Sequence, residues 1–280
     1  MKKIFTLLMI LSLVLMTGCG GSDDGKKNSA NEIKIGMIAH LNATEQKMKE
    51  IYDTMVKKAA LRVQLSTIKF YDSLSTMQMG LDSGDVTEIS TYKCVADYLK
   101  VAGKDKYVLV PEDSMLSKLS DSFCFAVRKD DTALKTDLDG AIEEMKTDGT
   151  LDSLVKTYVT DVKPDNIPAV EIPHFDGADT IKVGVTGDLP PLDFVTPDGK
   201  AAGFNTALLA EIAKHLNRNV EIISIDSGAR ASALASNQID VIFWVTLPDG
   251  TSVPSDIDTP EGVALSAPYF KDGVAHVKLK

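Results

Sequence analysis

Two charged side chains stand where a loop is expected to meet a helix or a strand, and both could hold a small charged molecule. Arg230 follows Asp226-Ser-Gly-Ala229 and lies at the start of the helix expected over residues 229–236. A guanidinium can hold a carboxylate through two parallel hydrogen bonds. Asp188 follows the strand expected over 181–185, before Pro190-Pro191, and could meet an ammonium group. A surface arginine and an aspartate that shapes a turn are the alternatives.

Three further polar or aromatic residues follow apolar strands. Asp72 comes directly after the strand expected over 68–71, where it could face a ligand or cap the next helix. Trp244, the one tryptophan of the chain, lies near the end of the apolar run 239–245. It is a candidate either for a pocket or for the core, and Thr246 is a similar candidate.

The composition excludes several classes of protein. The chain has 280 residues, 30 Lys+Arg and 40 Asp+Glu, so its formal net charge of −10 argues against binding to duplex nucleic acid. With 44% hydrophobic residues the chain can bury a core and is not globally disordered. Three cysteines and four scattered histidines give no metal-binding spacing, and we expect no metal, cofactor or catalytic residue. Cys94 and Cys124 are expected as buried free thiols, with a disulfide as the alternative.

The N-terminus predicts export and anchoring. Residues 1–18 carry two lysines, an apolar run from Ile4 to Met16 and then small residues, which is typical of a signal peptide. Met16-Thr17-Gly18-Cys19 resembles the lipobox of bacterial lipoproteins, in which the cysteine is lipidated. Residues 19–31 are Gly/Ser-rich and polar and predict a flexible tether. We therefore expect an extracytoplasmic, membrane-anchored lipoprotein, in the periplasm or at the cell surface.

The rest of the chain alternates short apolar runs with amphipathic stretches. This alternation predicts an α/β fold with a mostly parallel sheet. IKIGM at 33 and IKVGV at 181 start 148 positions apart, and LDSGDVTEI and LASNQIDVI start 153 apart, which favours two lobes of similar topology. Helices are expected over 46–58, 75–83, 95–101, 132–148, 151–158, 206–216 and 229–236. The helix over 132–148 has its apolar residues at 134, 138, 141, 142 and 145, which lie on one face.

Four segments of the second half carry a family resemblance. IKVGVTGDLPPLDF, DGKAAGFNTALLAEIAKHLN, ALASNQIDVIFW and LSAPYFKDGVAHV resemble the first lobe of the bacterial extracellular solute-binding proteins, family 3, which are receptors of polar-amino-acid ABC transporters. The first half is similar to that family's second lobe in KIGMIAHLNATEQK, FYDSLSTMQMGLDSGDV and CVADYL. The resemblance implies a two-lobed, periplasmic-binding-protein-like (type II) fold.

The order of the segments is inverted relative to that family. Residues 32–120 resemble its second lobe and residues 121–280 its first, with the returning strand and helices at 121–160, a linker at 161–178 and the opening segment at 179–280. This order indicates a circular permutation, and a fragment of tandem receptors is the rival account. The permutation predicts that Lys280 ends close to Lys34 at the hinge. It also predicts that only the chain near 120–127 joins the lobes covalently.

The resemblance also implies ligand contacts, with two departures. Thr44 matches the family's helix-opening threonine, which contacts a ligand carboxylate, and a simple cap is the alternative. The family's carboxylate-binding arginine follows the strand that aligns with 239–245, and here Thr246 and its neighbours include no arginine. The family's ammonium-binding aspartate aligns near Tyr92. Both departures put an ordinary amino-acid ligand in doubt, whereas Arg230 would face the cleft in this alignment.

The sequence therefore predicts a monomeric, non-enzymatic receptor. It would close around a small polar solute, amino-acid-like or carboxylate-bearing, and deliver it to an ABC permease. A sensing or interaction module without transport is one alternative, and an extracytoplasmic dehydratase-type enzyme using Glu45 or Asp188 is another. The predicted ligand-binding residues are Arg230, Thr44, Asp188, Trp244, Thr246, Asp72 and Tyr92, and the predicted lipidation site is Cys19.

Overall fold

The computed structural model describes residues 33–39, 65–111, 120–246 and 262–280. The signal peptide, the tether, Cys19, Thr44 and the helix expected over 46–58 lie outside the described residues. In the described residues no helix is both long and apolar enough to cross a membrane.

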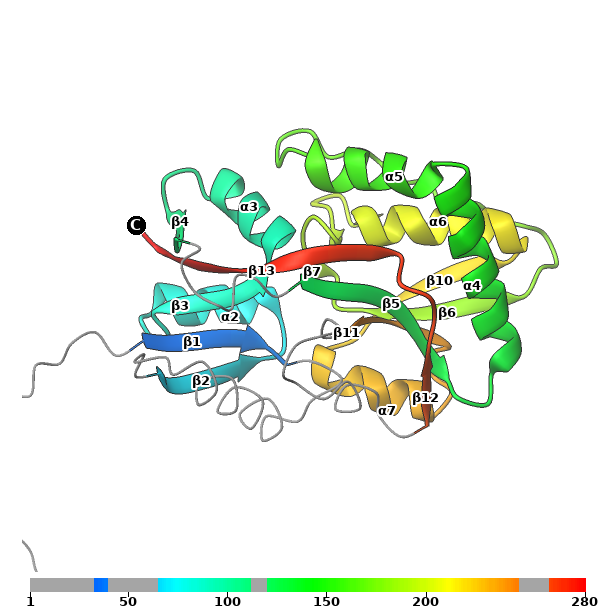
Figure 1. The fold of residues 1–280 in the computed structure, drawn as a ribbon, viewed down its shortest axis with the longest axis horizontal. Coiled ribbons are helices and arrows are strands. Elements are labelled where there is room, and N and C mark those ends of the chain that lie inside the picture. The colour runs from blue at the N-terminus through cyan, green and yellow to red at the C-terminus, as the bar shows by residue number, and fades with distance from the viewer. Residues whose placement is uncertain (1–32, 40–64, 112–119, 247–261) are drawn as a thin grey trace, which may run out of the picture. The chain divides into compact units, whose positions relative to one another are not determined.

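The described elements confirm the expected α/β class (Figure 1). The N-terminal half consists of β1 (Ile33–Ile38), β2 (Leu65–Tyr71), α2 (Leu74–Asp82), β3 (Glu88–Tyr92), α3 (Lys93–Ala102) and β4 (Tyr107–Leu109). The C-terminal half begins with β5 (Ser120–Arg128), α4 (Thr132–Thr147), α5 (Thr150–Val155) and the π-helical turn η2 (Lys156–Thr160). It continues with β6 (Thr180–Val185), β7 (Asp188–Leu189), β8 (Asp193–Val195), β9 (Ala201–Ala202), α6 (Phe204–Leu216), β10 (Asn219–Ser224), the 3₁₀ turn η3 (Ser227–Ala229), α7 (Arg230–Ala235), β11 (Val241–Thr246) and β12 (Val263–Leu265). The final strand is β13 (Phe270–Leu279).

The two halves of the sheet share one strand order. In the N-terminal half β2, β1 and β3 are parallel neighbours, and β13 adds to β3 in the antiparallel direction. In the C-terminal half β10, β6 and β11 are parallel neighbours, and β5 adds to β11 in the antiparallel direction. The common order agrees with the two lobes of similar topology that the repeated segments predict.

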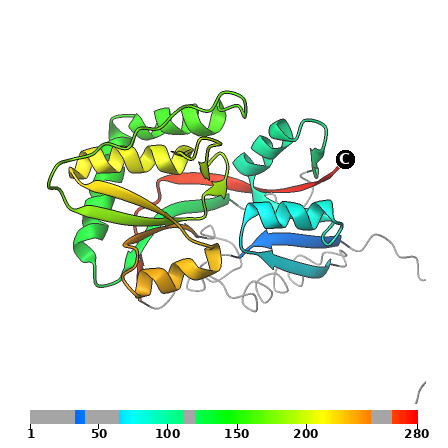
Figure 2. The ribbon, with the colours of Figure 1, turned by 180° about the vertical axis from the view of Figure 1, so that it is seen from behind.

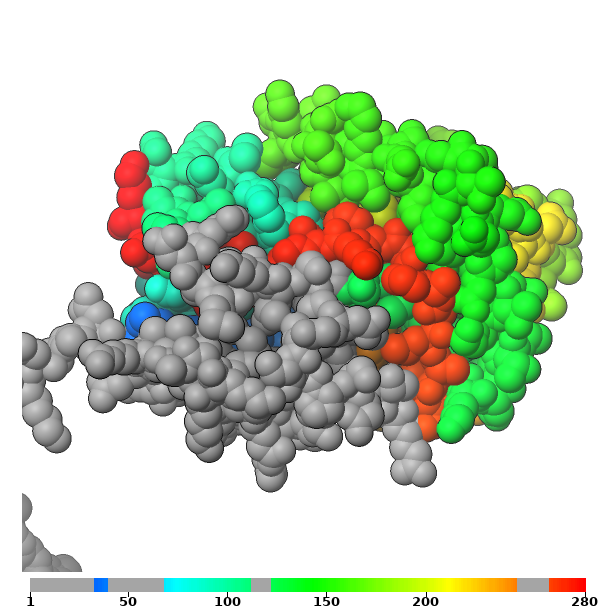
Figure 3. All heavy atoms as spheres, in the orientation of Figure 1, coloured from blue at the N-terminus to red at the C-terminus, as the bar shows by residue number. Residues whose placement is uncertain are grey.

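Two strands, rather than one, cross between the halves. β5 and β13 pair antiparallel with each other, from Phe123 with Phe270 to Ser120 with Gly273. Beyond this pairing β13 continues along β3 and β4, and it lies at the surface between segments of both halves (Figure 3). The expectation that only the chain near 120–127 joins the lobes is therefore wrong. At about 3.3 Å per residue, a ten-residue strand is long enough to run through both halves.

The position of the C-terminus also differs from the expectation. The Lys280 N–H donates to the Lys106 carbonyl at 3.0 Å, so the end of the chain lies beside β4. β3 separates the end of β13 from β1, which contains Lys34. Lys280 thus lies at the far end of β13 in the N-terminal half, and not at the hinge where β5 and β13 pair.

Helices cover both faces of the C-terminal half of the sheet. α4 and α6 pack together on one face, and α7 lies on the other (Figures 1 and 2). α4 is capped by Asp131, whose carboxylate accepts the Leu134 N–H at 3.1 Å, and its expected apolar positions are all buried. The segment expected as the returning one, 121–160, therefore packs on the segment 181–280.

Candidate functional site

Arg230 begins α7 and lies close to carboxylates without pairing with them. Its Nε is buried and has no hydrogen-bond partner among the described residues. Burial lowers the pKa of the guanidinium, while the charges of Asp193, Tyr92 and Asp188 act in the opposite direction. Arg230 is thus a partly buried cation with an open hydrogen-bonding position, close to residues of both halves.

Asp188, in the short strand β7, contacts the other half directly. Its Oδ2 accepts hydrogen bonds from the Ser75 N–H at 3.0 Å and from the Ser75 hydroxyl at 2.9 Å. Its Oδ1 is buried and has no partner among the described residues. The carboxylate therefore reaches across to the first turn of α2.

Asp193 is a site residue that the sequence analysis did not single out. It is 5% exposed, and its carboxylate accepts hydrogen bonds from the Thr186 hydroxyl (3.2 Å), the Gly187 N–H (3.0 Å) and the Asn205 amide (3.0 Å). Burial raises its pKa, while the Gly187 N–H and the charge of Arg230 lower it. One signal was available, because Asp193 is a charged residue between Leu192 and Phe194 in an otherwise apolar run.

Two tyrosines lie near these charged groups, Tyr92 near Arg230 and Tyr269 near Asp193. Tyr92 ends β3, and its ring meets Phe123 edge-on at 4.8 Å between ring centroids. Tyr269 is 3% exposed, and its hydroxyl has no partner among the described residues. Burial raises the pKa of Tyr269 well above its usual value, and the nearby Cys124, Asp193 and Tyr92 add to this effect.

These residues form one cluster, which we name the Arg230 cluster: Tyr92, Asp188, Asp193, Arg230 and Tyr269. Buried polar atoms without partners are rare in folded proteins, and ordered water or a ligand commonly satisfies them. The cluster has three such atoms among the described residues, and they include both donors and acceptors. This arrangement can bind a small polar molecule through a guanidinium, carboxylates and phenols.

The other predicted residues lie around or outside this cluster. Asp72 is exposed, its carbonyl accepts the Ser227 N–H at 3.5 Å, and Ser73 rather than Asp72 caps α2. Trp244 is 1% exposed and packs in a second core with Ala233 of α7, so its ring is a core residue. Thr246 is the last residue of β11, and the structure describes its backbone but not its side chain.

The two cysteines and a surface cavity are not members of the Arg230 cluster, although Cys124 lies near Tyr269. Cys94 and Cys124 are both buried, and neither forms a disulfide among the described residues, which confirms the expectation of buried thiols. A shallow cavity of about 400 Å³ lies at the ends of α4 and α6 and contains none of the predicted residues. No group of three or more histidine, cysteine or acidic side chains in the described part of the chain could hold a metal ion.

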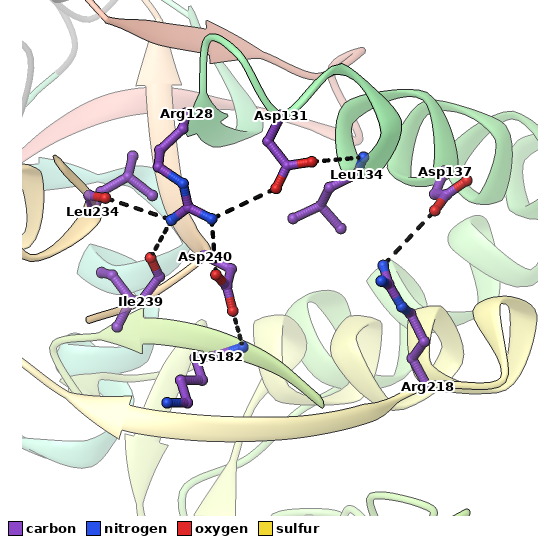
Figure 4. Close-up of polar contacts among 9 residues, drawn as sticks. All are labelled: Arg128, Asp131, Leu134, Asp137, Lys182, Arg218, Leu234, Ile239 and Asp240. Atoms are coloured by element: carbon purple, nitrogen blue, oxygen red, sulfur yellow. Dashed lines mark hydrogen bonds and ion pairs between the residues drawn. The ribbon is translucent and has the colours of Figure 1, made fainter. Parts of the chain in front are cut away.

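Arg128, the last residue of β5, fixes the far end of α7 (Figure 4). Its side chain is only 18% exposed. It donates to the carbonyls of Ile239 at 2.7 Å and Leu234 at 3.5 Å, and it pairs with Asp240 at 2.9 Å. The second oxygen of Asp240 accepts the N–H of Lys182 in β6 at 3.0 Å. This network joins β5, β6 and α7, and so it holds the helix that begins with Arg230.

Comparisons with known proteins agree with the predicted resemblance. Residues 181–247 match the model of the bacterial extracellular solute-binding proteins, family 3. Over 95 residues the chain is 33% identical to the L-cystine-binding protein TcyJ of Escherichia coli (strain K12), covering 34% of this chain and 36% of that protein. The chain thus matches about a third of the length of its curated relatives.

Two solved structures illustrate the structural likenesses. The GluR0 ligand-binding core from Nostoc punctiforme in complex with (L)-glutamate is 8% identical, covers 89% of this chain and 85% of its own, and has a TM-score of 0.38. The ligand-binding component of an ABC-type import system from Staphylococcus aureus with zinc bound is 11% identical, covers 88% and 65%, and has a TM-score of 0.41. Through residues 181–247, this chain is similar to the bacterial extracellular solute-binding proteins of family 3.

Proposed function

We propose that this protein is an extracytoplasmic solute-binding lipoprotein that captures a small polar solute between its two halves for an ABC transporter. The Arg230 cluster is the observation that supports this proposal most directly. Its residues come from both halves, and Arg230 and Asp188 each keep a buried polar atom free of protein partners in the described structure. A solute with an anionic group would satisfy Arg230, and a donor group on the same solute would satisfy Asp188.

The family match supports a role in binding rather than in catalysis. General acid–base catalysis needs a titratable group placed for proton transfer. In the described part of the cluster, Asp188 already accepts two hydrogen bonds from Ser75, and Asp193 accepts three. The hydrogen bonds hold both carboxylates in place and leave Asp188 Oδ1 as an acceptor for a solute, which suits a binding surface better than a proton-transfer site.

We further propose that the chain is a circular permutation of this family's fold. The pairing of β5 with β11 and the packing of α4 on α6 support this, because the returning segment then completes the half that contains the family match. The rival account, a fragment of tandem receptors, has a different consequence. An immunoblot of the native host should show one band near 30.2 kDa for the permutation and a much larger band for the tandem protein.

Thermal unfolding against a ligand panel tests the proposed function. The compact unit Glu32–Lys280 would be melted with amino acids (cystine among them), polyamines, dicarboxylates and small peptides. A ligand at 100 times its dissociation constant should add about 2.7 kcal/mol to the free energy of unfolding. The stabilisation should vanish in Arg230→Ala and persist in Arg218→Ala, which removes a half-buried arginine that pairs with Asp137 and Asp179 among the described residues.

The outcomes separate the alternatives. A folded protein that no compound stabilises would favour a sensing or interaction module. Turnover of a compound in the panel would favour the dehydratase-type enzyme. A hit that survives Arg230→Ala would contradict the assignment of Arg230.

A further inference from the structure

The contact between Asp188 and Ser75 joins two segments that are 113 positions apart in the sequence. Ser75 is the second residue of α2, where backbone N–H groups have no partner within the helix. A negative charge at this end of a helix is favourable, because it meets the free N–H groups and the positive end of the helix dipole. The first turn of α2 has no acidic residue of its own. Asp188 supplies that charge from the opposite half.

Two neighbouring contacts between the described halves are weaker. The Ser227 N–H donates to the Asp72 carbonyl at 3.5 Å, at the limit of a hydrogen bond. The rings of Tyr98 in α3 and Phe194 in β8 lie 6.4 Å apart between centroids. The Asp188 carboxylate, with two hydrogen bonds of 3.0 Å or less, is a charge-assisted contact and therefore a stronger one.

Because β5 and β13 are the strands that cross between the described halves, a further contact between the halves can affect how they are arranged. Away from β5 and β13, the described halves are held together by side-chain and loop contacts. Domains joined by a few strands commonly open and close about those strands. A contact made only in the closed arrangement shifts the population toward that arrangement.

We propose that Asp188 is a latch, whose carboxylate on the first turn of α2 holds the two halves together in the absence of any ligand. The latch does not depend on the identity of the solute or on the proposed transport function. Its consequence is a protein that is closed before a ligand arrives and that opens when the bond between Asp188 and Ser75 breaks.

Hydrogen–deuterium exchange of the ligand-free protein, extracted from cells that express the full chain, tests the latch. Asp188→Asn should raise the exchange rate about tenfold at the start of α2 and, together with it, in the segment 227–235 of the other half. Ser75→Asp should do the same, because it places a like charge against Asp188. Asp198→Asn, which removes an exposed carboxylate of the same half, should change neither segment.

Three results would overturn the latch. One is unchanged exchange in Asp188→Asn, and a second is faster exchange confined to the first turn of α2, which would make Asp188 a local cap. A third is unprotected exchange in both segments of the unmodified protein. Circular dichroism of each variant shows that it is folded, and Ser75→Asp provides the independent variant should Asp188→Asn fail to fold.

Discussion

Arg128 and Asp240 lie 2.9 Å apart although 112 positions separate them in the sequence, and their contact ties the crossing strand β5 to the loop before β11. The same guanidinium donates to the carbonyl of Leu234 in the last turn of α7 and to the carbonyl of Ile239 beyond it. A residue at the end of one strand thereby sets the position of a helix whose first residue is Arg230. The chemistry of the Arg230 cluster therefore depends on a pair of residues that is not part of it.

Removing Arg128 should destabilise the protein. Arg128→Ala leaves the Ile239 carbonyl and the Asp240 carboxylate without their partner, which typically costs about 3–5 kcal/mol when the pair is largely buried. Urea unfolding measures the change in the free energy of unfolding. Arg218→Ala, in which the lost ion pairs are 3.8 and 3.9 Å long and more exposed, should cost less than about 1 kcal/mol. Equal losses in the two variants would contradict the role of Arg128.

Two glycine-to-alanine substitutions should change the free energy of unfolding in opposite directions. Gly203, directly before α6, has a φ of +104°, and a Cβ there would lie 2.5 Å from the Leu192 carbonyl oxygen. Gly203→Ala should therefore lower the free energy of unfolding by about 1–3 kcal/mol or more. Gly140 lies inside α4, where a Cβ would meet nothing within 4 Å. Gly140→Ala should raise stability by about 0.5–1 kcal/mol, and thermal melts of both variants give the two signs.

Asp193 should make stability fall as the pH rises through its titration range. Burial raises the pKa of Asp193 in the folded protein, so the folded state keeps this proton at pH values where the unfolded state, with a pKa near ~3.9, has lost it. Between the two pKa values the folded state binds more protons, and raising the pH there lowers the free energy of unfolding. The stability of the unmodified protein relative to Asp193→Asn should decline across this window.

Asp198 provides the contrast for that experiment. The Thr196 hydroxyl and then Lys200 hold its pKa below the usual value. Its stabilising contribution is present above the unfolded pKa and is lost as the pH falls, so Asp198→Asn should show a difference of the opposite slope. Urea unfolding at a series of acidic pH values measures both. A flat difference for Asp193→Asn would contradict the environment described for Asp193.

The single tryptophan reports on the core. Trp244 is 1% exposed and packs among Ala126, Ala233 and Ile242, so its fluorescence should be blue-shifted and poorly quenched by acrylamide. Unfolding should shift the emission to the red. A ligand that binds at the Arg230 cluster should leave the emission wavelength nearly unchanged. A large shift on binding would instead support the pocket role that the sequence suggested for Trp244.

Association of the protein with the membrane should depend on Cys19. Cys19→Ser should move the protein from the membrane fraction to the soluble fraction or leave it unprocessed, because the proposed lipid on this cysteine would supply the anchor. Metabolic labelling with a fatty acid followed by cell fractionation measures this. Labelling that persists in the Cys19→Ser variant would contradict the assignment.

Helices and strands that follow from a local sequence pattern could be predicted from the sequence. The apolar positions of α4 follow the helical repeat, and all five expected from it, Leu134, Leu138, Ala141, Ile142 and Met145, are buried. The strand β6 and the helix α6 likewise lie within two residues of their expected bounds. In each case neighbours along the chain determine the structure, so the pattern is visible without the fold.

Features that depend on distant partners were not predictable in this way. Arg128 looks like a surface residue until β5 is placed beside β11 and the end of α7. Asp193 is satisfied partly by Asn205, which only the start of α6 brings close. The full course of β13 depends on pairing with β3, about 180 positions earlier, and no local signal gives that register.

The course of β13 has a consequence for the order in which the protein can fold. β3 and β4, made early in synthesis, receive their shared neighbour only from residues near position 275. Until then each of them presents an open edge, and open edges pair readily with other chains. The N-terminal half therefore completes its sheet only after β13 has been made, and until then its open edges favour premature association.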